Sequence, residues 1–193
     1  MSSFSTFIRW CGLLAIVGAL IFAMLGLLAS RGLNPEHLLP LLLGMLAAIA
    51  GLHTLQRERY RLWGVLSSLT SFVGVALLLA SGLLDLIAGQ RPTISSLTVD
   101  LLIIGAWVAA LGLVTLGVVT IWARVLPWWC GASIILGSPP AVFIVWAFLA
   151  FVGETRFYSV PPALVLGIAW SLVGYAIFRQ ARVGQTQQTS RVR

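Results

Sequence analysis

Side chains that could do acid–base or ligand chemistry are few in this chain and lie far apart. Its two histidines, His37 and His53, fall near opposite ends of one apolar run. At ~1.5 Å per helical residue they stand about 24 Å apart, so they cannot bind one ligand together. Either one alone could be the axial ligand of a haem or a chlorin. Because an interfacial histidine is more often solvated or hydrogen-bonded, the sequence identifies no cofactor.

Acidic residues give an equally weak signal for catalysis. Asp85 and Asp100 lie on either side of Arg91, and a carboxylate pair can serve in acid–base chemistry or in ion binding. Both carboxylates fall near the predicted membrane surface, where solvated charges are the simpler interpretation. The sequence has no HExxH, P-loop or GxGxxG motif, no Ser/His/Asp arrangement and no zinc-ligand spacing. We therefore predict a protein that is not an enzyme and has no metal site.

The sharpest local signal is Gly137-Ser138-Pro139-Pro140, in the middle of the fifth apolar run. Proline lacks an N–H donor and clashes with the preceding turn, so the helix is predicted to bend there, with Ser138 helping to satisfy the backbone. In transporters, interrupted helices at mid-membrane often form binding sites. A plain kink, whose backbone groups find partners in neighbouring helices, is the commoner outcome, and we favour it.

Hydroxyl side chains form a second polar feature, at a predicted depth of about 8–12 Å from the cytoplasmic helix ends at ~1.5 Å per residue. They could line an inward-facing pocket for a substrate or partner. They could equally join neighbouring helices through hydrogen bonds worth about 0.6 kcal/mol each, which is the interpretation we favour. The residues are Ser67, Ser68, Thr70, Ser71, Thr115, Ser133 and Ser171.

Six long apolar runs must position these side chains. The 193-residue chain is 60% hydrophobic and 9% charged, whereas soluble proteins carry about 25% charged residues. Each run approaches or exceeds the ~20 residues that cross a bilayer as a helix, and barrel strands alternate in short segments instead. The sequence predicts an all-α, polytopic membrane protein with six transmembrane helices. The runs are Phe7–Ser30, Leu38–Leu55, Leu62–Leu86, Leu97–Ala123, Leu126–Val152 and Val160–Phe178.

One bundle and one tail account for the predicted domain organisation. The first run is longer than a signal-peptide h-region of ~7–15 residues and lacks a good cleavage site, so we expect a retained helix. Because the connections between runs are short, residues 1–182 are predicted to form a single six-helix bundle. The polar segment 183–193 is predicted to be a disordered cytoplasmic tail.

Arginine supplies all twelve basic residues and is unevenly distributed. Nine fall on one side of the predicted membrane, so the positive-inside rule places that side and both termini in the cytoplasm. We expect the cytoplasmic (inner) membrane of a bacterium, whose reducing interior disfavours a disulfide between Cys11 and Cys130. The nine are Arg9, Arg57, Arg59, Arg61, Arg124, Arg179, Arg182, Arg191 and Arg193, and the other three are Arg31, Arg91 and Arg156.

The runs pair into three helical hairpins with similar ends. Tryptophan and glycine recur where odd-numbered helices start, and a glycine recurs shortly before an arginine where even-numbered helices end. We predict three parallel repeats around an axis along the membrane normal, the alternative being coincidence in a chain rich in both residues. The recurring segments are Arg9–Gly12, Arg61–Gly64 and Trp128–Gly131, and Gly51–Thr54, Gly117–Thr120 and Gly174–Ile177.

Small residues four apart mark the faces where helices are predicted to approach closely. They are Ala15, Ala19 and Ala23, then Gly44 with Ala48, Ala47 with Gly51, Gly105 with Ala109, Ala106 with Ala110, and Gly167 with Ser171.

We therefore predict a non-catalytic structural or accessory subunit in the lipid bilayer. Its partner would be another membrane protein, a pigment, a lipid or a second copy of the chain. The net charge of +7 is not gathered on a soluble face, so no nucleic-acid partner is expected. The alternative is a small transporter or channel for a neutral or hydrophobic solute, which would use the break at Pro139 and Pro140 together with the hydroxyl residues.

Overall fold

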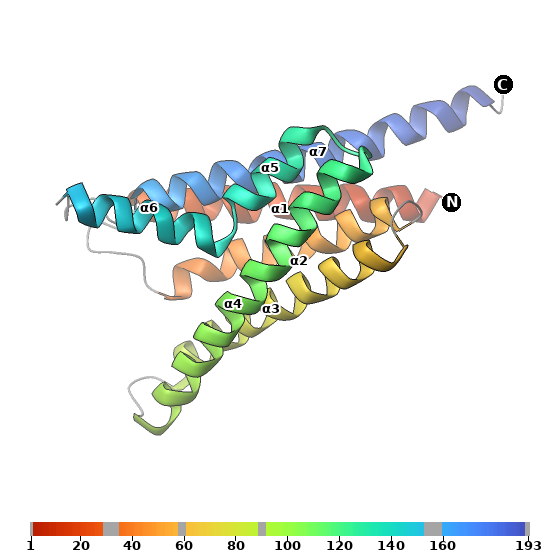
Figure 1. The fold of residues 1–193 in the computed structure, drawn as a ribbon. Coiled ribbons are helices and arrows are strands. Elements are labelled where there is room, and N and C mark those ends of the chain that lie inside the picture. The colour runs from red at the N-terminus through yellow and green to blue at the C-terminus, as the bar shows by residue number, and fades with distance from the viewer. Residues whose placement is uncertain (1, 29–34, 58–60, 89–91, 153–159, 192–193) are drawn as a thin grey trace.

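The computed structural model is helical and describes residues 2–28, 35–57, 61–88, 92–152 and 160–191 (Figure 1). Seven helices lie within these ranges, which agrees with the predicted all-α fold. In chain order they are α1 (Ser2–Leu28), α2 (Pro35–Gln56), α3 (Arg61–Ala88), α4 (Pro92–Ala123), α5 (Trp128–Leu136), α6 (Pro139–Val152) and α7 (Val160–Arg191).

Within the described ranges, five helices are long and apolar enough to cross a membrane: α1, α2, α3, α4 and α7. The remaining predicted run is divided, because α5 has 9 residues and α6 has 14. The structure thus has five continuous candidate spans rather than six. Pro139 and Pro140 cannot continue the preceding helix, so the predicted distortion takes the form of a full break at Gly137 and Ser138.

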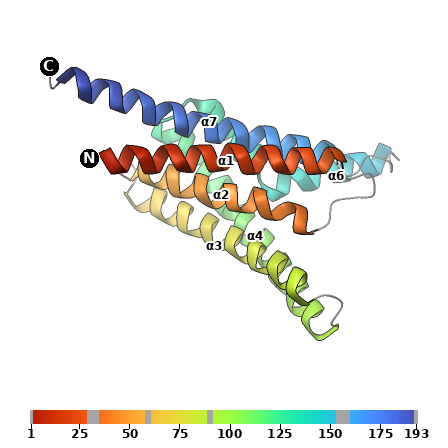
Figure 2. The same cartoon turned by 180° about the vertical axis from the view of Figure 1, so that it is seen from behind.

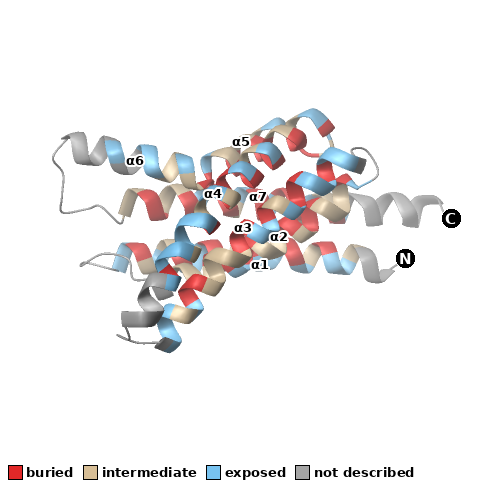
Figure 3. Ribbon diagram, turned by 60° about the horizontal axis from the view of Figure 1, so that its bottom comes forward, coloured by how far each residue is buried: buried red, intermediate tan, exposed pale blue. Residues whose placement is uncertain are grey.

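The helices form a tightly packed group and a partly separate hairpin. Helices α1 and α7 lie side by side, α2 packs on α1, and α5 packs on α4 and α7 (Figures 1 and 2). Helices α3 and α4 pair with each other, and their far end diverges from the other helices in both views. The buried core lies where the helices meet (Figure 3), and it includes Phe22, Leu113 and Trp170.

Glycines occupy the closest helix crossings. A Cβ atom on Gly12 would lie 2.7 Å from the carbonyl oxygen of Gly174, and a Cβ atom on Gly174 would lie 2.7 Å from that of Gly12. Because real Cβ atoms do not approach that closely, α1 and α7 can touch here only where both side chains are missing. A Cβ would also meet a neighbouring helix within 3 Å at Gly18, Gly74, Gly112, Gly117, Gly131 and Gly167.

The predicted small-residue faces lie against other helices. Ala15 and Ala19 of α1, Ala48 of α2 and Ala109 of α4 are buried. A Cβ on Gly167 of α7 would lie 2.7 Å from the Cβ of Ala23. Small side chains therefore bring these helices together, as the spacing indicated.

Helix α3 buries small polar side chains and exposes large apolar ones. Ser67, Ser68, Ser71 and Ser81 are buried, and the Ser81 hydroxyl donates a hydrogen bond of 2.8 Å to the carbonyl oxygen of Thr98 on α4. In water it would be unfavourable to expose large apolar side chains and bury polar ones, whereas lipid tails solvate leucine well. The surface of α3 is therefore compatible with a lipid environment. Its exposed large apolar side chains include Leu62, Leu66, Leu69, Phe72, Val73 and Leu83.

Both ends of the chain leave the helices on the same side of the molecule, where α1 begins and α7 ends (Figure 1). Helix α7 continues to Arg191, so the structure has helix where the sequence favoured a disordered tail from residue 183. Glutamine and arginine have good helix propensity. A helix that is already nucleated by a long apolar segment also extends at low cost.

Candidate functional site

Several backbone groups at the break between α5 and α6 are hydrogen-bonded. The Gly137 N–H donates to the Ser133 carbonyl at 2.8 Å, and the Ser138 N–H donates to the Ile135 carbonyl at 3.2 Å. The Ser138 hydroxyl also donates to the Ile135 carbonyl, and α6 restarts with the Ala141 N–H bonded to the Ser138 carbonyl at 3.1 Å. Ser138 thus gives a backbone carbonyl at the break a hydrogen-bond donor, as we predicted from the sequence.

Trp170 of α7 forms a further hydrogen bond to the backbone at the break. Its side chain is 1% exposed, and its indole Nε1 donates a hydrogen bond of 2.9 Å to the Gly137 carbonyl oxygen. A Cβ on Gly137 would lie 2.7 Å from that nitrogen, so glycine leaves the room that the indole needs. Sequence reasoning missed Trp170. A tryptophan in the middle of a predicted span was the available signal, because tryptophan prefers membrane interfaces.

These contacts favour a kink over an open binding site at the break. A transporter-type site needs freed carbonyls that are available to a substrate or ion. Here the carbonyls of Ile135 and Gly137 already accept hydrogen bonds from Ser138 and Trp170. The arrangement stabilises the junction of α5, α6 and α7, and this is its clearest chemical consequence.

Several hydroxyl residues bond within their own helix. The hydroxyls of Ser71 and Ser67 donate to the carbonyls of Ser67 and Gly64, at 2.7 and 3.3 Å, and Thr115 donates to the Leu111 carbonyl at 2.8 Å. Our expectation of bonds between helices is wrong for these three hydroxyls. A Ser or Thr hydroxyl reaches the carbonyl three or four residues earlier without help from a neighbour.

The hydroxyl residues are also divided among several helix interfaces. Helix α3, which carries Ser67, Ser68 and Ser71, packs on α2 and α4, whereas α5, with Ser133, packs on α4, α6 and α7. Ser68 and Ser171 have buried hydroxyl oxygens without a hydrogen-bond partner among the described residues. They lie on α3 and α7, so each belongs to a different packing region, and the structure does not gather the predicted layer into one pocket.

Gln56 and Thr120 form a polar contact that sequence reasoning missed. Both are fully buried at the ends of α2 and α4, and the Gln56 Nε2 donates to the Thr120 hydroxyl oxygen at 2.7 Å. That hydroxyl in turn donates to the Leu116 carbonyl at 2.7 Å. The contact was missed because Gln56 directly precedes a basic segment. A polar residue at that place is typical of a loop rather than of a contact between helices.

The remaining candidates are two histidines and two aspartates. His37 and His53 lie in the first and last turns of α2 and are half-buried. Asp85 and Asp100 are exposed, and Arg91 lies outside the described residues. In the part of the chain that the structure describes, no three His, Cys, Asp or Glu residues gather into a possible metal site.

Comparisons with protein-family models, with characterised proteins and with solved structures gave no match for this chain.

We expect Trp170→Phe to lower the melting temperature of the protein in mild detergent. The Gly137 carbonyl loses its donor, which costs about 1 kcal/mol, and the smaller phenyl ring leaves a cavity that adds to the loss. The matched control is Trp63→Phe, because Trp63 is 68% exposed. Thermal unfolding followed by intrinsic fluorescence measures both variants. If Trp170→Phe melts with the wild type, the indole hydrogen bond does not hold the break.

Proposed function

We propose that this chain is a six-span protein of a bacterial cytoplasmic membrane and works as a non-catalytic accessory subunit. Its partner is a transmembrane helix of another membrane protein, which docks on the exposed face of α4. The observation that carries the proposal is a large exposed tryptophan, Trp107, near the middle of that helix.

Six spans follow if α5 and α6 cross the membrane together. Figure 1 shows them following one another in the same general direction, away from the end where α1 begins. At ~1.5 Å per residue, their 9 and 14 residues are long enough in series for a hydrocarbon core of ~30 Å. With the uneven arginine distribution, this path supports cytoplasmic termini.

Two glycine pairs support the proposed repeats. Gly12 meets Gly174 where α7 packs on α1, and Gly131 meets Gly117 where α5 packs on α4. In both pairs, a glycine at the start of an odd-numbered predicted span faces one at the end of an even-numbered span. Gly51 departs from this pattern, because a Cβ there would meet side chains of α1 and α7 instead.

The docking face is a stripe along one side of α4. Ile104, Trp107 and Leu111 stand three or four residues apart and are 53%, 70% and 65% exposed, so they form one surface. Lipid can cover leucine and isoleucine, but hydrocarbon has no acceptor for an indole N–H. A partner helix can supply both an acceptor and close packing.

The alternative is a small transporter or channel for a neutral or hydrophobic solute. Its one remaining support is that the buried hydroxyl oxygens of Ser68 and Ser171 have no hydrogen-bond partner among the described residues, although they lie on different helices. Purification in mild detergent separates the two proposals. A partner in fixed stoichiometry supports the accessory subunit, and an isolated protein that takes up solute after reconstitution supports transport.

We expect a benzophenone amino acid at position 107 to cross-link to one partner protein in intact membranes. The same probe at position 168 is the matched control, because Ile168 is an apolar, 59% exposed position within another candidate span. Mass spectrometry of the adducts identifies the cross-linked peptide. Lipid adducts alone at 107, or the same protein adducts at both positions, would contradict a docking face on α4.

Reporter fusions test the proposed orientation. Fusions after Arg31, Arg91 and Arg156 should report the outside, and fusions after Arg61, Arg124 and Arg182 should report the cytoplasm, because the arginine-rich loops remain inside. Paired alkaline phosphatase and fluorescent-protein reporters give opposite readouts at each site. A reversed pattern at two or more sites overturns the topology.

A further inference from the structure

The short turn between α4 and α5 combines an exposed arginine with two exposed tryptophans. Trp122 lies in the last turn of α4 and Trp128 is the first residue of α5, and their side chains are 68% and 71% exposed. Arg124, which lies between them in the sequence, is exposed as well. Figure 1 shows this turn at the end of the molecule where α1 begins.

The helix crossing next to the turn places both tryptophans at one level. A Cβ on Gly117 of α4 would lie 2.8 Å from the carbonyl oxygen of Gly131 on α5. Trp122 follows Gly117 by five residues and Trp128 precedes Gly131 by three, so at ~1.5 Å per residue their heights differ by only about 3 Å. Leu126 of the turn is buried in the core. The turn is therefore held against the bundle while both indoles face outwards.

Arg124 adopts a backbone conformation that favours glycine. Its φ is 50°, in the left-handed region, where a Cβ causes strain that glycine avoids. A strained residue of this kind points to a role for its side chain. Because the Arg124 side chain is exposed, we look for its partner in the surroundings of the protein.

The other end of α4 carries acidic rather than basic charge. Asp100 is exposed near the start of α4, and Asp85 is exposed in the last turn of α3. Asp100 and Trp122 are 22 residues apart, which is about 33 Å along a helix and close to the ~30 Å of a hydrocarbon core. When Trp122 lies at one bilayer surface, Asp100 therefore lies at the other.

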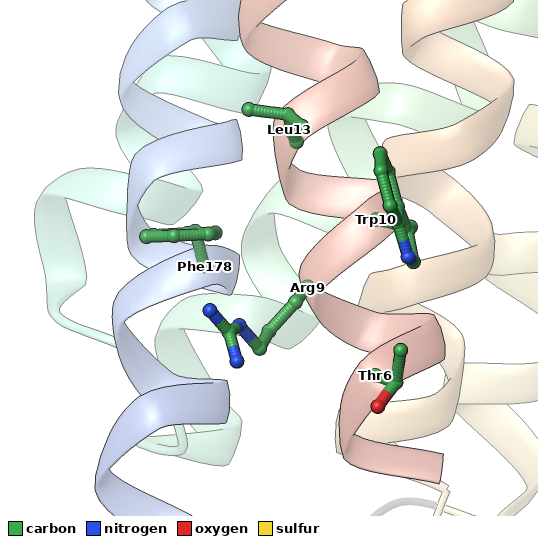
Figure 4. A pocket seen from close by; sticks show the side chains of 5 residues that line it. All are labelled: Thr6, Arg9, Trp10, Leu13 and Phe178. Carbon is green, nitrogen blue, oxygen red and sulfur yellow. The ribbon is translucent and has the colours of Figure 1, made fainter. Parts of the chain in front are cut away.

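The polar layer of a bilayer complements this turn. An indole ring prefers the membrane interface, where its apolar body and its N–H meet different surroundings. A guanidinium group forms charge-assisted, bidentate hydrogen bonds with phosphate oxygens. Two further exposed tryptophans lie where other helices begin: Trp63 of α3, and Trp10 of α1, which lines a pocket between α1 and α7 with Leu13 and Phe178 (Figure 4).

We propose that the turn from Trp122 to Trp128 anchors the protein in the headgroup layer of the bilayer, with the Arg124 guanidinium bound to lipid phosphate. The two indoles lie just below it, at the boundary with the acyl chains. The bond to phosphate offsets the strain of the left-handed backbone. The inference rests on the membrane insertion proposed above, but it is independent of partner docking at Trp107.

Fluorescence quenching in lipid vesicles tests the level of the turn. The full-length protein is reconstituted into phosphatidylcholine that is brominated either close to the ester groups or close to the chain ends. The emission lost in a Trp122→Phe, Trp128→Phe double variant gives the contribution of the turn, and the emission lost in Trp107→Phe gives that of a tryptophan near the middle of a span. We expect shallow bromine to quench the turn more strongly, and deep bromine to quench Trp107 more strongly.

The two ways of failing are distinct. Stronger quenching of the turn by deep bromine, with Trp107 behaving as expected, would overturn the anchor and leave membrane insertion standing. No quenching of Trp107 or of the turn at either depth would overturn the insertion and the anchor together.

Melting temperatures test the arginine. Arg124→Gly and Arg124→Gln both remove the charge, but only glycine relieves the backbone. In dodecyl maltoside, which has no phosphate, we expect Arg124→Gly to melt about 2–4 °C above the wild type and Arg124→Gln to melt close to it. In nanodiscs of palmitoyl-oleoyl phosphatidylcholine and phosphatidylglycerol, both variants should gain about 2–4 °C less from lipid than the wild type gains.

The matched control is Arg57→Gln, which removes the same charge from an exposed arginine after α2 and should lose less of the gain from lipid. An equal loss in Arg57→Gln would show that only net charge matters and would overturn the role of Arg124. A full gain from lipid in Arg124→Gln would overturn it too. If millimolar inorganic phosphate in detergent stabilised the wild type as much as lipid does, the ligand would be a free anion and the anchor would be wrong.

Discussion

The structure depends on the direct approach of helix backbones at glycine. In lipid, apolar side chains gain little from packing against one another rather than against acyl chains, so helix association relies on close van der Waals contact. Gly12 with Gly174 joins α1 to α7, and Gly117 with Gly131 joins α4 to α5. Any side chain at these crossings would separate the helices and the contacts that surround them.

A few buried polar side chains form hydrogen bonds where helices lie close together. Trp170 can reach the Gly137 carbonyl because a missing side chain leaves space at the break. Gln56 and Thr120 form a separate buried polar contact between α2 and α4. On the outside, α3 presents leucine and phenylalanine to its surroundings while its serines face inward. This inversion is what a hydrocarbon solvent favours, and it links the packing to the proposed place in the membrane.

Periodicity and composition predicted the features that depend only on residues close together in the sequence. Apolar runs gave the long helices, small residues spaced by four gave the packing faces, and Pro139 with Pro140 gave the position of the break, because each is a property of nearby residues. The hydroxyl layer failed for a physical reason: Ser71 and Thr115 satisfy themselves on their own helix. The place of Trp170 within a predicted span was a signal, but its contact with Gly137 could not be predicted, because the two residues lie far apart in the chain and meet only through helix packing.

The most direct test of backbone-limited packing is the thermal stability of Gly112→Ala compared with Gly51→Ala in the same mild detergent. A Cβ on Gly112 would meet the backbone of Ser71, whereas one on Gly51 would meet the side chains of Cys11 and Ile177, at 3.0 and 3.3 Å. Alanine favours a helix over glycine by up to about 1 kcal/mol at both positions. We therefore predict that Gly112→Ala destabilises the protein by roughly 1–3 kcal/mol through overpacking against a backbone, while Gly51→Ala destabilises it clearly less, because its tightest contact is 3.0 Å. A Gly112→Ala protein as stable as the wild type or more so would contradict the account.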